Sequence, residues 1–277
     1  MKKIIKTYYA NVQNMGDLLN ELLIRNVFGQ DLVRHKPSTS ELSCIGSGMD
    51  SFMKKNRMYP RWYSTALQLQ SKFVNYPNIV WCTGFLYSET EDSKFIRQME
   101  FSSVRGELTK ARVEKIIGQK LDIPTGDGGI LAPLLFEKTI PKEYSMGIVP
   151  HMNELDNPIF QEVKQKYPNA IIIDLTVDPM LVIKQIAQCD YIISTSLHGL
   201  VVADSFKIPN KWIKLTNLMK GDGFKYHDYY SAYGVTNEPI DISNGDSPTI
   251  NQIIDDYKVI PDIMEKKQKE VHDAFPF

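Results

Sequence analysis

The sequence predicts an α/β protein with two Rossmann-like domains. Short apolar segments of strand length alternate with longer segments of helical periodicity along the 277 residues, a pattern typical of parallel βαβ units. Glycine and proline interrupt this alternation repeatedly between residues 125 and 142, where we place the crossing between domains. Residues 1–135 then form the N-terminal domain and residues 136–277 the C-terminal domain, with the two sheets facing a cleft.

The individual elements follow from local patterns. Strands are expected at the short apolar runs, residues 4–9, 43–45, 79–82, 101–104, 144–149, 170–175, 191–193 and 212–213. Helices are expected at residues 18–28, 159–167, 197–206 and 249–271, and also beginning near residues 107 and 179. Asp178 and Pro179 start a helix, because aspartate caps the first turn and proline fits where no N–H is needed. The last helical segment breaks near Pro261 and is expected to pack back on the first domain.

Composition excludes several classes of protein. The formal net charge is −1, so no global basic field points to nucleic acid, and an anionic ligand needs a local pocket. Cys44, Cys82 and Cys189 form no CxxC pair and are expected to be buried free thiols in a reducing compartment. The chain lacks a signal-peptide pattern and the roughly 20 apolar residues of a membrane span. We expect a cytoplasmic protein, and peripheral contact with the inner face of a membrane stays open.

The most informative motif is Ile-Ile-Ser-Thr-Ser-Leu-His-Gly-Leu at residues 192–200. A strand ends and a helix begins there, so the hydroxyl groups are expected to cap the first turn, whose free N–H groups bind anions. His198 in that turn can bind an anion when charged and can donate a proton near neutral pH. The alternative is a capped helix with a packed histidine, but the strand end and Gly199, which allows close approach, favour function. Four further residues of the motif are assigned to substrate binding: Ser194, Ser196, Leu197 and Gly199.

An arginine follows the strand at residues 101–104. Arg105 precedes Gly106, and its planar guanidinium suits a carboxylate or a phosphate. A surface ion pair, for example with Glu107, explains the same residues equally well.

Two loops after strands of the first half can also contact a substrate. Asn14, Gly16 and Asp17 precede a helix, where Asn14 or Asp17 can act as the cap. A sugar-hydroxyl partner or a catalytic base is the functional alternative. The loop Gly46, Ser47 and Gly48 is a weaker signal, because glycine pairs mark turns more often than phosphate loops.

The second half adds a histidine and a lysine. His151 follows a strand end and Pro150, and it serves the same cleft if the sheet is parallel; a structural histidine is the equal alternative. Residues 220–230 read as a loop whose lysines, Lys220 and Lys225, neutralise phosphate and whose tyrosines stack on a sugar. An aromatic loop packed on the domain is the alternative, and His227 is assigned a structural role.

Together these segments resemble the polysaccharide pyruvyltransferase family. The resemblance runs in order through Asn14-x-Gly16-Asp17, Gly46-Ser47-Gly48, Trp81-x-Thr83-Gly84, residues 104–109, Gly126-Asp127, residues 147–151, residues 193–199 and Phe224-x-x-x-Asp228-Tyr229. It implies a fold like that of the GT-B glycosyltransferases, phosphoenolpyruvate as donor, and a ketal-forming transfer to a sugar of a bacterial capsule or exopolysaccharide. It maps the donor-binding arginine and histidine of the family to Arg105 and His198. Some relatives carry a second arginine where this chain has Ser196, and Lys220 or Lys225 is the candidate replacement.

The resulting hypothesis is that Arg105 and the helix start at His198 bind the two anionic ends of the donor from separate domains. His198 is the expected general acid, with His151 second, and Asp17 is the expected base on the acceptor. No metal or cofactor is expected, and whether the acceptor is a lipid-linked galactose-type sugar stays open. The alternatives are a GT-B glycosyltransferase that uses a sugar nucleotide and a binding module without turnover.

Overall fold

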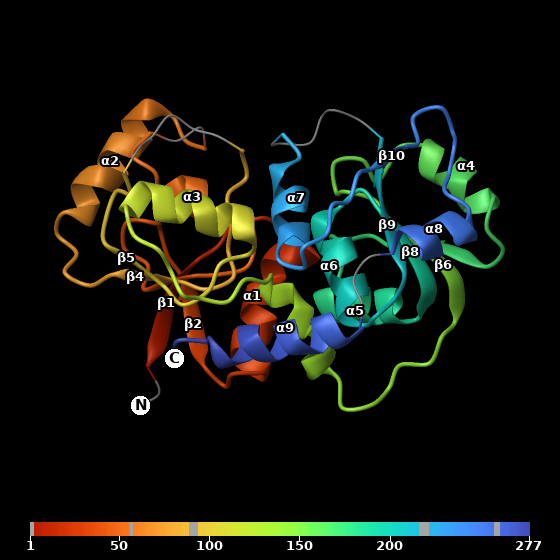
Figure 1. The fold of residues 1–277 in the computed structure, drawn as a ribbon, viewed down its shortest axis with the longest axis horizontal. Coiled ribbons are helices and arrows are strands. Elements are labelled where there is room, and N and C mark those ends of the chain that lie inside the picture. The colour runs from red at the N-terminus through yellow and green to blue at the C-terminus, as the bar shows by residue number, and fades with distance from the viewer. Residues whose placement is uncertain (1–2, 56–57, 89–93, 216–221, 258–260) are drawn as a thin grey trace.

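The computed structural model describes residues 3–55, 58–88, 94–215, 222–257 and 261–277. Two five-stranded sheets lie side by side, and every strand pairing in both sheets is parallel (Figure 1). The first sheet contains β1 (Ile4–Tyr8), β2 (Asp31–Arg34), β3 (Leu42–Ser43), β4 (Asn78–Val80) and β5 (Met99–Phe101). The second contains β6 (Tyr144–Val149), β7 (Ala170–Ile172), β8 (Cys189–Ser194), β9 (Asn210–Lys214) and β10 (Ile240–Asp241). The α/β class with two Rossmann-like units is thereby confirmed.

Helices cover these sheets and connect them. The helices of the first half are α1 (Met15–Asn26), η1 (Met49–Phe52), α2 (Arg61–Ser71), α3 (Glu107–Ile117) and η2 (Gly128–Leu135). Those that follow are α4 (Ile159–Gln165), α5 (Pro179–Ala187), α6 (Leu197–Ser205), α7 (Phe224–Ser231), α8 (Ile250–Asp256) and α9 (Pro261–Asp273). None of the described helices is both long and apolar enough to cross a bilayer.

The two sheets share one topology. The strand orders are β2-β1-β3-β4-β5 and β10-β9-β8-β6-β7, so each sheet places its second strand outside its first and its third strand on the other side. The strand order therefore reverses between β1 and β3 and between β6 and β8. In open α/β sheets ligands bind beyond the carboxyl ends of the strands at such a switch point. The loops after β1, β3, β6 and β8 are therefore where the fold positions a site.

An apolar core joins the two halves. Helix α1 of the first half packs against η2 and α5, and the Met15 N–H donates to the Leu175 carbonyl at 2.8 Å. One cluster of buried side chains contains Leu19 and Leu23 of α1 together with Val182 and Val201 of the second half. A large apolar contact of this kind opposes relative motion of the halves.

Helix α9 runs beneath both halves and ends close to the start of the chain (Figure 1). It packs on η2, and the Trp81 indole N–H of the first half donates to the Val271 carbonyl at 3.0 Å. Beyond the helix, the Phe275 ring stacks on Phe28 at 3.8 Å between centroids. The expected break at Pro261 is present, since α8 and α9 are separate helices.

Most predicted elements are present with shifted ends. Helix α1 begins at Met15 rather than at residue 18, and β5 ends at Phe101, with Val104 forming only a single bridge to Thr125. The Asp178 cap is confirmed, because its carboxylate accepts from the Leu181 N–H at 2.9 Å. Cys44, Cys82 and Cys189 are buried free thiols, as expected. The boundary at residue 135 stays a prediction.

The sequence analysis missed β2, α2, α7 and β10, and also the short helices η1 and η2. In β2 only Leu32 is buried, because the strand lies at the edge of its sheet, so the apolar pattern that reveals a central strand is absent.

Candidate active site

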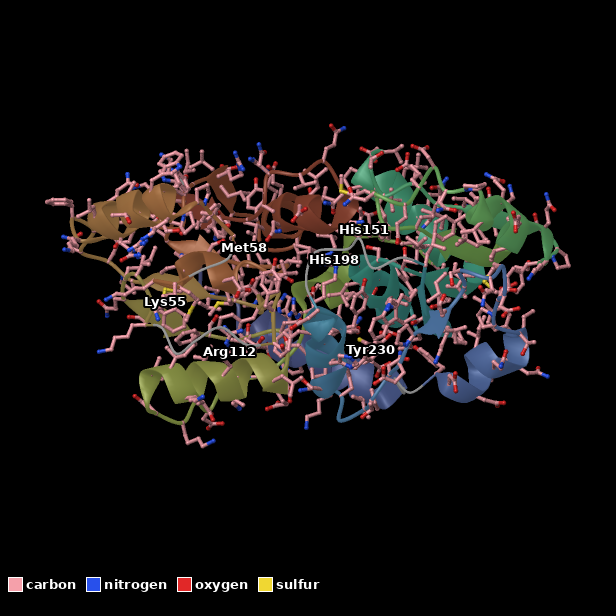
Figure 2. The ribbon with its side chains drawn as sticks, turned by 90° about the horizontal axis from the view of Figure 1, so that it is seen from above. Lys55, Met58, Arg112, His151, His198 and Tyr230 are labelled. Carbon is pink, nitrogen blue, oxygen red and sulfur yellow. The ribbon has the colours of Figure 1, made fainter. Side chains whose placement is uncertain are left out.

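His198 stands in the first turn of α6, at the switch point of the second sheet, and packs on α1 of the other half. A Cβ added to Gly16 would lie 2.0 Å from His198 Nδ1, so only glycine allows the imidazole to approach α1 this closely. In the view of Figure 2, the labelled His198 and His151 are both seen near the middle of the molecule. The structure therefore brings the predicted Gly16 and His198 into direct contact from opposite halves.

The hydroxyl groups before His198 do not cap α6, and that prediction was wrong. Ser196 occupies the cap position, but its side chain makes no capping hydrogen bond. The buried Ser194 hydroxyl accepts from the Ser196 N–H at 2.9 Å and lies 2.9 Å from the Val149 carbonyl, which fixes the loop to β6. Leu197 is also buried, and the space beside Gly199 is filled by the Ser194 hydroxyl rather than by a ligand. Contacts of these residues with a substrate stay predictions.

Asp127 is the nearest acidic partner of His198. Its carboxylate caps η2 by accepting from the Gly129 N–H at 2.9 Å, and its second oxygen, Oδ2, lies 4.0 Å from His198 Nε2. Both of these facing atoms are enclosed and have no hydrogen-bond partner in the described chain. Burial lowers the pKa of His198 to about 3, with Lys225 and Arg105 acting in the same direction, and burial raises the pKa of Asp127 to about 6. Without a ligand the imidazole is therefore neutral at pH 7.

Asn14 and Asp17 form the start of α1. The Asn14 amide oxygen accepts from the Asp17 N–H at 3.2 Å, and its amide nitrogen donates to the Asp17 carboxylate at 2.5 Å, so Asn14 is the cap. Burial raises the pKa of Asp17 to about 6, against the Asn14 hydrogen bond and the charge of Lys225. A carboxyl group with a pKa of this size can accept a proton near neutral pH.

Lys225 brings a cation to the same place from the first turn of α7. Burial lowers the pKa of its amine to about 8, Arg105 lowers it further, and Asp17 and Glu154 oppose the shift. The charge of Lys225 also lowers the pKa of both His151 and His198. Lys225 is therefore a mostly charged amine that acts electrostatically on Asp17 and on both histidines. Lys220 lies outside the described residues.

His151 lies just beyond β6, next to the loop that carries His198. Its N–H donates to the Thr195 hydroxyl at 2.7 Å, and its Nδ1 accepts from the Asn153 N–H at 3.3 Å. Burial and then Lys225 lower its pKa. The sheet is parallel, so His151 reaches the same edge as His198, the condition on which its assignment depended.

Arg105 is fully buried, so the alternative of a surface ion pair with Glu107 was wrong. Its Nε donates to the Asp228 carboxylate at 2.9 Å. The rest of the guanidinium donates to the Ser47 hydroxyl at 2.8 Å and to the carbonyls of Gly46 at 3.2 Å and Phe85 at 2.6 Å. Contact of Arg105 with the donor stays a prediction, and it requires the guanidinium to exchange these partners.

Asp228 on α7 is the partner that ties the halves together. Besides Arg105, its carboxylate accepts from the Thr109 N–H and from the Thr109 hydroxyl, both at 2.7 Å. Asp127 and Asp228 belong to the motifs that carry the family resemblance, but the sequence analysis gave neither residue a role. Their partners lie 71 and 123 positions away in sequence, so only the fold reveals the pairs.

The loop of Gly46, Ser47 and Gly48 follows β3 at the switch point of the first sheet. Gly46 has φ +114°, a conformation that favours glycine, and its carbonyl accepts from Arg105. The Gly48 N–H donates to the Thr83 hydroxyl at 3.1 Å. The loop thus supports Arg105, and its contact with a substrate stays a prediction.

The tyrosines after Gly223 form no sugar-stacking loop, contrary to that prediction. Residues 224–231 are α7, and Tyr226, Tyr229 and Tyr230 are buried. The Tyr226 ring stacks on Trp212 at 4.1 Å between centroids, so the aromatic groups belong to the core.

This fold and this arrangement of residues belong to a known class. The family model described as polysaccharide pyruvyl transferase matches residues 14–214, from the cap of α1 to the end of β9, and the chain belongs to this family. Lys225 and Asp228 lie beyond the matched segment.

Two curated relatives match part of the chain. An uncharacterized protein, L143, of Acanthamoeba polyphaga mimivirus is 28% identical over 166 residues, which are 58% of this chain and 56% of that protein. The succinoglycan biosynthesis protein ExoV of Rhizobium meliloti (strain 1021) is 29% identical over 167 residues, which are 57% of this chain and 48% of that protein. The chain thus spans about half the length of these relatives.

Breaking the Arg105–Asp228 pair should be costly. Asp228→Ala leaves a buried guanidinium without its counter-charge, so we expect a loss of about 3–5 kcal/mol in the free energy of unfolding. The control Asp31→Ala breaks an exposed pair with Arg25 and should cost about 0–1 kcal/mol. Urea unfolding measures both variants, and equal losses would contradict the buried pair as the link between halves.

Asp127 should make stability depend on pH. Because its pKa is raised from 3.8 to about 6, the stability associated with its protonated form is complete below pH 3.8 and is lost as the pH rises through 6. Asp127→Asn still accepts from the Gly129 N–H but cannot ionise. Between pH 4 and pH 8 the free energy of unfolding of this variant should therefore rise by roughly 2–3 kcal/mol relative to that of wild type. Urea unfolding at both pH values tests this. The control Asp122→Asn changes an exposed carboxyl group and should show the same change in stability between the two pH values as wild type.

Proposed function

We propose that this protein transfers a pyruvyl group from phosphoenolpyruvate to a sugar, forming a cyclic ketal in polysaccharide biosynthesis. Membership of the polysaccharide pyruvyl transferase family supports the reaction class. The observation that carries the assignment to a site is the convergence of His198, Asp17 and Lys225 from α6, α1 and α7 at the switch points of both sheets. The relative named for succinoglycan biosynthesis supports a role in glycan synthesis.

The donor is a small anion with a carboxylate and a phosphate. Lys225 offers a charged amine beside His198, and the N-terminal end of α6 offers backbone N–H groups at the same position. We propose that these two features contact the donor first, because the Arg105 guanidinium of the sequence hypothesis is paired with Asp228. Arg105 adds positive potential to the site, since it lowers the pKa of both Lys225 and His198.

His198 is the proposed general acid. Transfer begins when a proton moves to the methylene carbon of phosphoenolpyruvate, which leaves positive charge on the adjacent carbon. A sugar hydroxyl adds to that carbon and loses its proton to a base, for which Asp17 has a suitable pKa of about 6. Phosphate then leaves with the bridging oxygen, and a second hydroxyl closes the ketal and gives its proton to phosphate. One proton enters at the methylene carbon and two leave from the sugar hydroxyls. Phosphate takes one of these two, and the one taken by the base is left to restore the general acid.

We further propose that the reaction uses no metal and no cofactor besides the donor substrate. We place the protein in the cytoplasm, with a lipid-linked galactose-type sugar presented at the inner face of the membrane and a capsule or exopolysaccharide as the product.

Donor binding is tested by thermal stability. A ligand at 100 times its dissociation constant stabilises the folded state by about 2.7 kcal/mol, so phosphoenolpyruvate should raise the melting temperature of wild type. The shift should shrink in Lys225→Met and persist in Lys184→Met, which changes an exposed lysine of α5. A shift with sugar nucleotides and none with phosphoenolpyruvate would instead favour a glycosyltransferase.

Protonation of His198 should accompany donor binding. The anionic donor should raise the imidazole pKa from about 3, so binding takes up a proton and weakens as the pH rises. Titration calorimetry in buffers of different ionisation heat measures this uptake. Asp17, Asp127 and Lys225 titrate nearby, so the decrease in uptake in His198→Asn isolates the imidazole.

The same variant tests catalysis. His198→Asn should lower the rate of phosphate release in the presence of acceptor by about 10²–10⁴, the usual contribution of a general acid. Unchanged proton uptake together with near-normal turnover would remove His198 from the mechanism.

A further inference from the structure

A second pocket lies on the other side of β1 from the switch point. Its volume is about 510 Å³, within the range of small-molecule sites. It is lined by side chains from β1, from the end of β2 and the loop after it, and from α2 and the segment before it: Tyr8, Arg34, His35, Lys36, Pro37, Thr39, Tyr59, Tyr63 and Gln70. It therefore opens at the carboxyl ends of the first two strands, where this type of sheet places ligands.

One wall of the pocket is aromatic and carries hydroxyl groups. The Tyr59 and Tyr63 rings meet edge to face, with centroids 5.1 Å apart. The Tyr8 hydroxyl lies 2.8 Å from the Tyr59 hydroxyl and 2.6 Å from the Ser51 hydroxyl, and burial raises its pKa far above the neutral range. A wall of rings with neutral hydroxyl groups suits the apolar face and the hydroxyls of a sugar.

The other wall is cationic. Arg34 and Lys36 are exposed, and neither forms an ion pair with any residue in the described part of the chain. His35 lies between them, held by the Thr39 hydroxyl at 3.2 Å from its Nδ1. No carboxylate is among the described residues that line the pocket. In a chain of net charge −1, two uncompensated cations facing one pocket indicate an anionic ligand.

The wall of the pocket packs against a loop of the candidate active site. The Tyr8 ring lies 3.2 Å from where a Cβ on Gly48 would stand, and the neighbouring Ser47 hydroxyl accepts from Arg105. The Gly46–Gly48 loop therefore lies between the tyrosine wall of the pocket and Arg105.

We propose that this pocket binds a phosphorylated sugar unit of the acceptor. The tyrosines contact the sugar ring, and Arg34 and Lys36 pair with the phosphate, whose two charges match two cations better than a single carboxylate does. The inference rests on the proposed function only in taking the bound sugar to be part of the acceptor. The phosphate belongs either to a soluble sugar phosphate or to a lipid-linked sugar diphosphate.

Titration calorimetry of the full chain with galactose 1-phosphate tests the pocket. The probe should bind at least tenfold more tightly than galactose or inorganic phosphate alone, and binding should weaken at high salt. The double variant Arg34→Gln/Lys36→Gln should bind it at least tenfold more weakly. The control Arg61→Gln/Lys72→Gln removes two exposed cations of the α2 region that do not line the pocket and should bind like wild type.

Stabilisation by phosphoenolpyruvate separates the two proposals. It should be the same in the double variant as in wild type, because Arg34 and Lys36 are not part of the donor site. Galactose 1-phosphate binding without any effect of phosphoenolpyruvate would keep the pocket and remove the proposed reaction. Failure of galactose 1-phosphate to bind, or equal binding in the double variant and the control, would overturn the pocket.

A vesicle experiment then identifies the source of the phosphate. Vesicles of phosphatidylcholine, with or without a galactosyl diphosphate polyprenol, are sedimented with wild type and with the double variant. Sedimentation that requires both the polyprenol and the two cations supports the pocket with a lipid-linked acceptor. Binding of the soluble probe alone supports it with a soluble sugar phosphate.

Discussion

The site depends on one buried ion pair between the halves. Arg105 and Asp228 are both fully enclosed, and the guanidinium also holds the loop after β3, while the carboxylate also holds the start of α3. Desolvated charges of this kind must stay paired, because separating them leaves an uncompensated charge in the interior. The pair therefore fixes α7, and with it Lys225, against the switch point of the first sheet. The proposed donor contact of Lys225 and the support of the fold by Asp228 therefore come from one short helix.

The sequence was most informative about residues that follow strand ends. The positions of His198, His151, Asp17 and Gly16 could be predicted because parallel strands bring their carboxyl ends to one edge, and the structure places all four there. The roles of Arg105 and Asp127 could not be predicted. A guanidinium after a strand looks the same in sequence whether it is open to an anion or enclosed by a distant carboxylate. The apolar pattern likewise could not reveal β2, because an edge strand buries only one of its side chains.

The shared core changes how the two halves are expected to act. In the sequence hypothesis, two separate domains each bring one anion-binding group to the donor. In the structure, α1 already packs on η2 and α5, and Gly16 already touches His198. The groups that would bind the donor are therefore preorganised, which lowers the entropic cost of assembling them. The second pocket lies on the first half alone, so an acceptor could bind there without disturbing this interface.

The path of α9 has a consequence for how the chain folds. Trp81 of the first sheet finds its hydrogen-bond acceptor at Val271, 190 positions later, and Phe28 finds its stacking partner at Phe275. During synthesis the first half emerges long before these partners, so the Trp81 indole and the Phe28 ring stay uncovered while the second sheet is made. Contacts of such high sequence separation slow folding and expose apolar surface to aggregation. The first half therefore completes its core only when the second half is present, and the two are expected to fold as one cooperative unit.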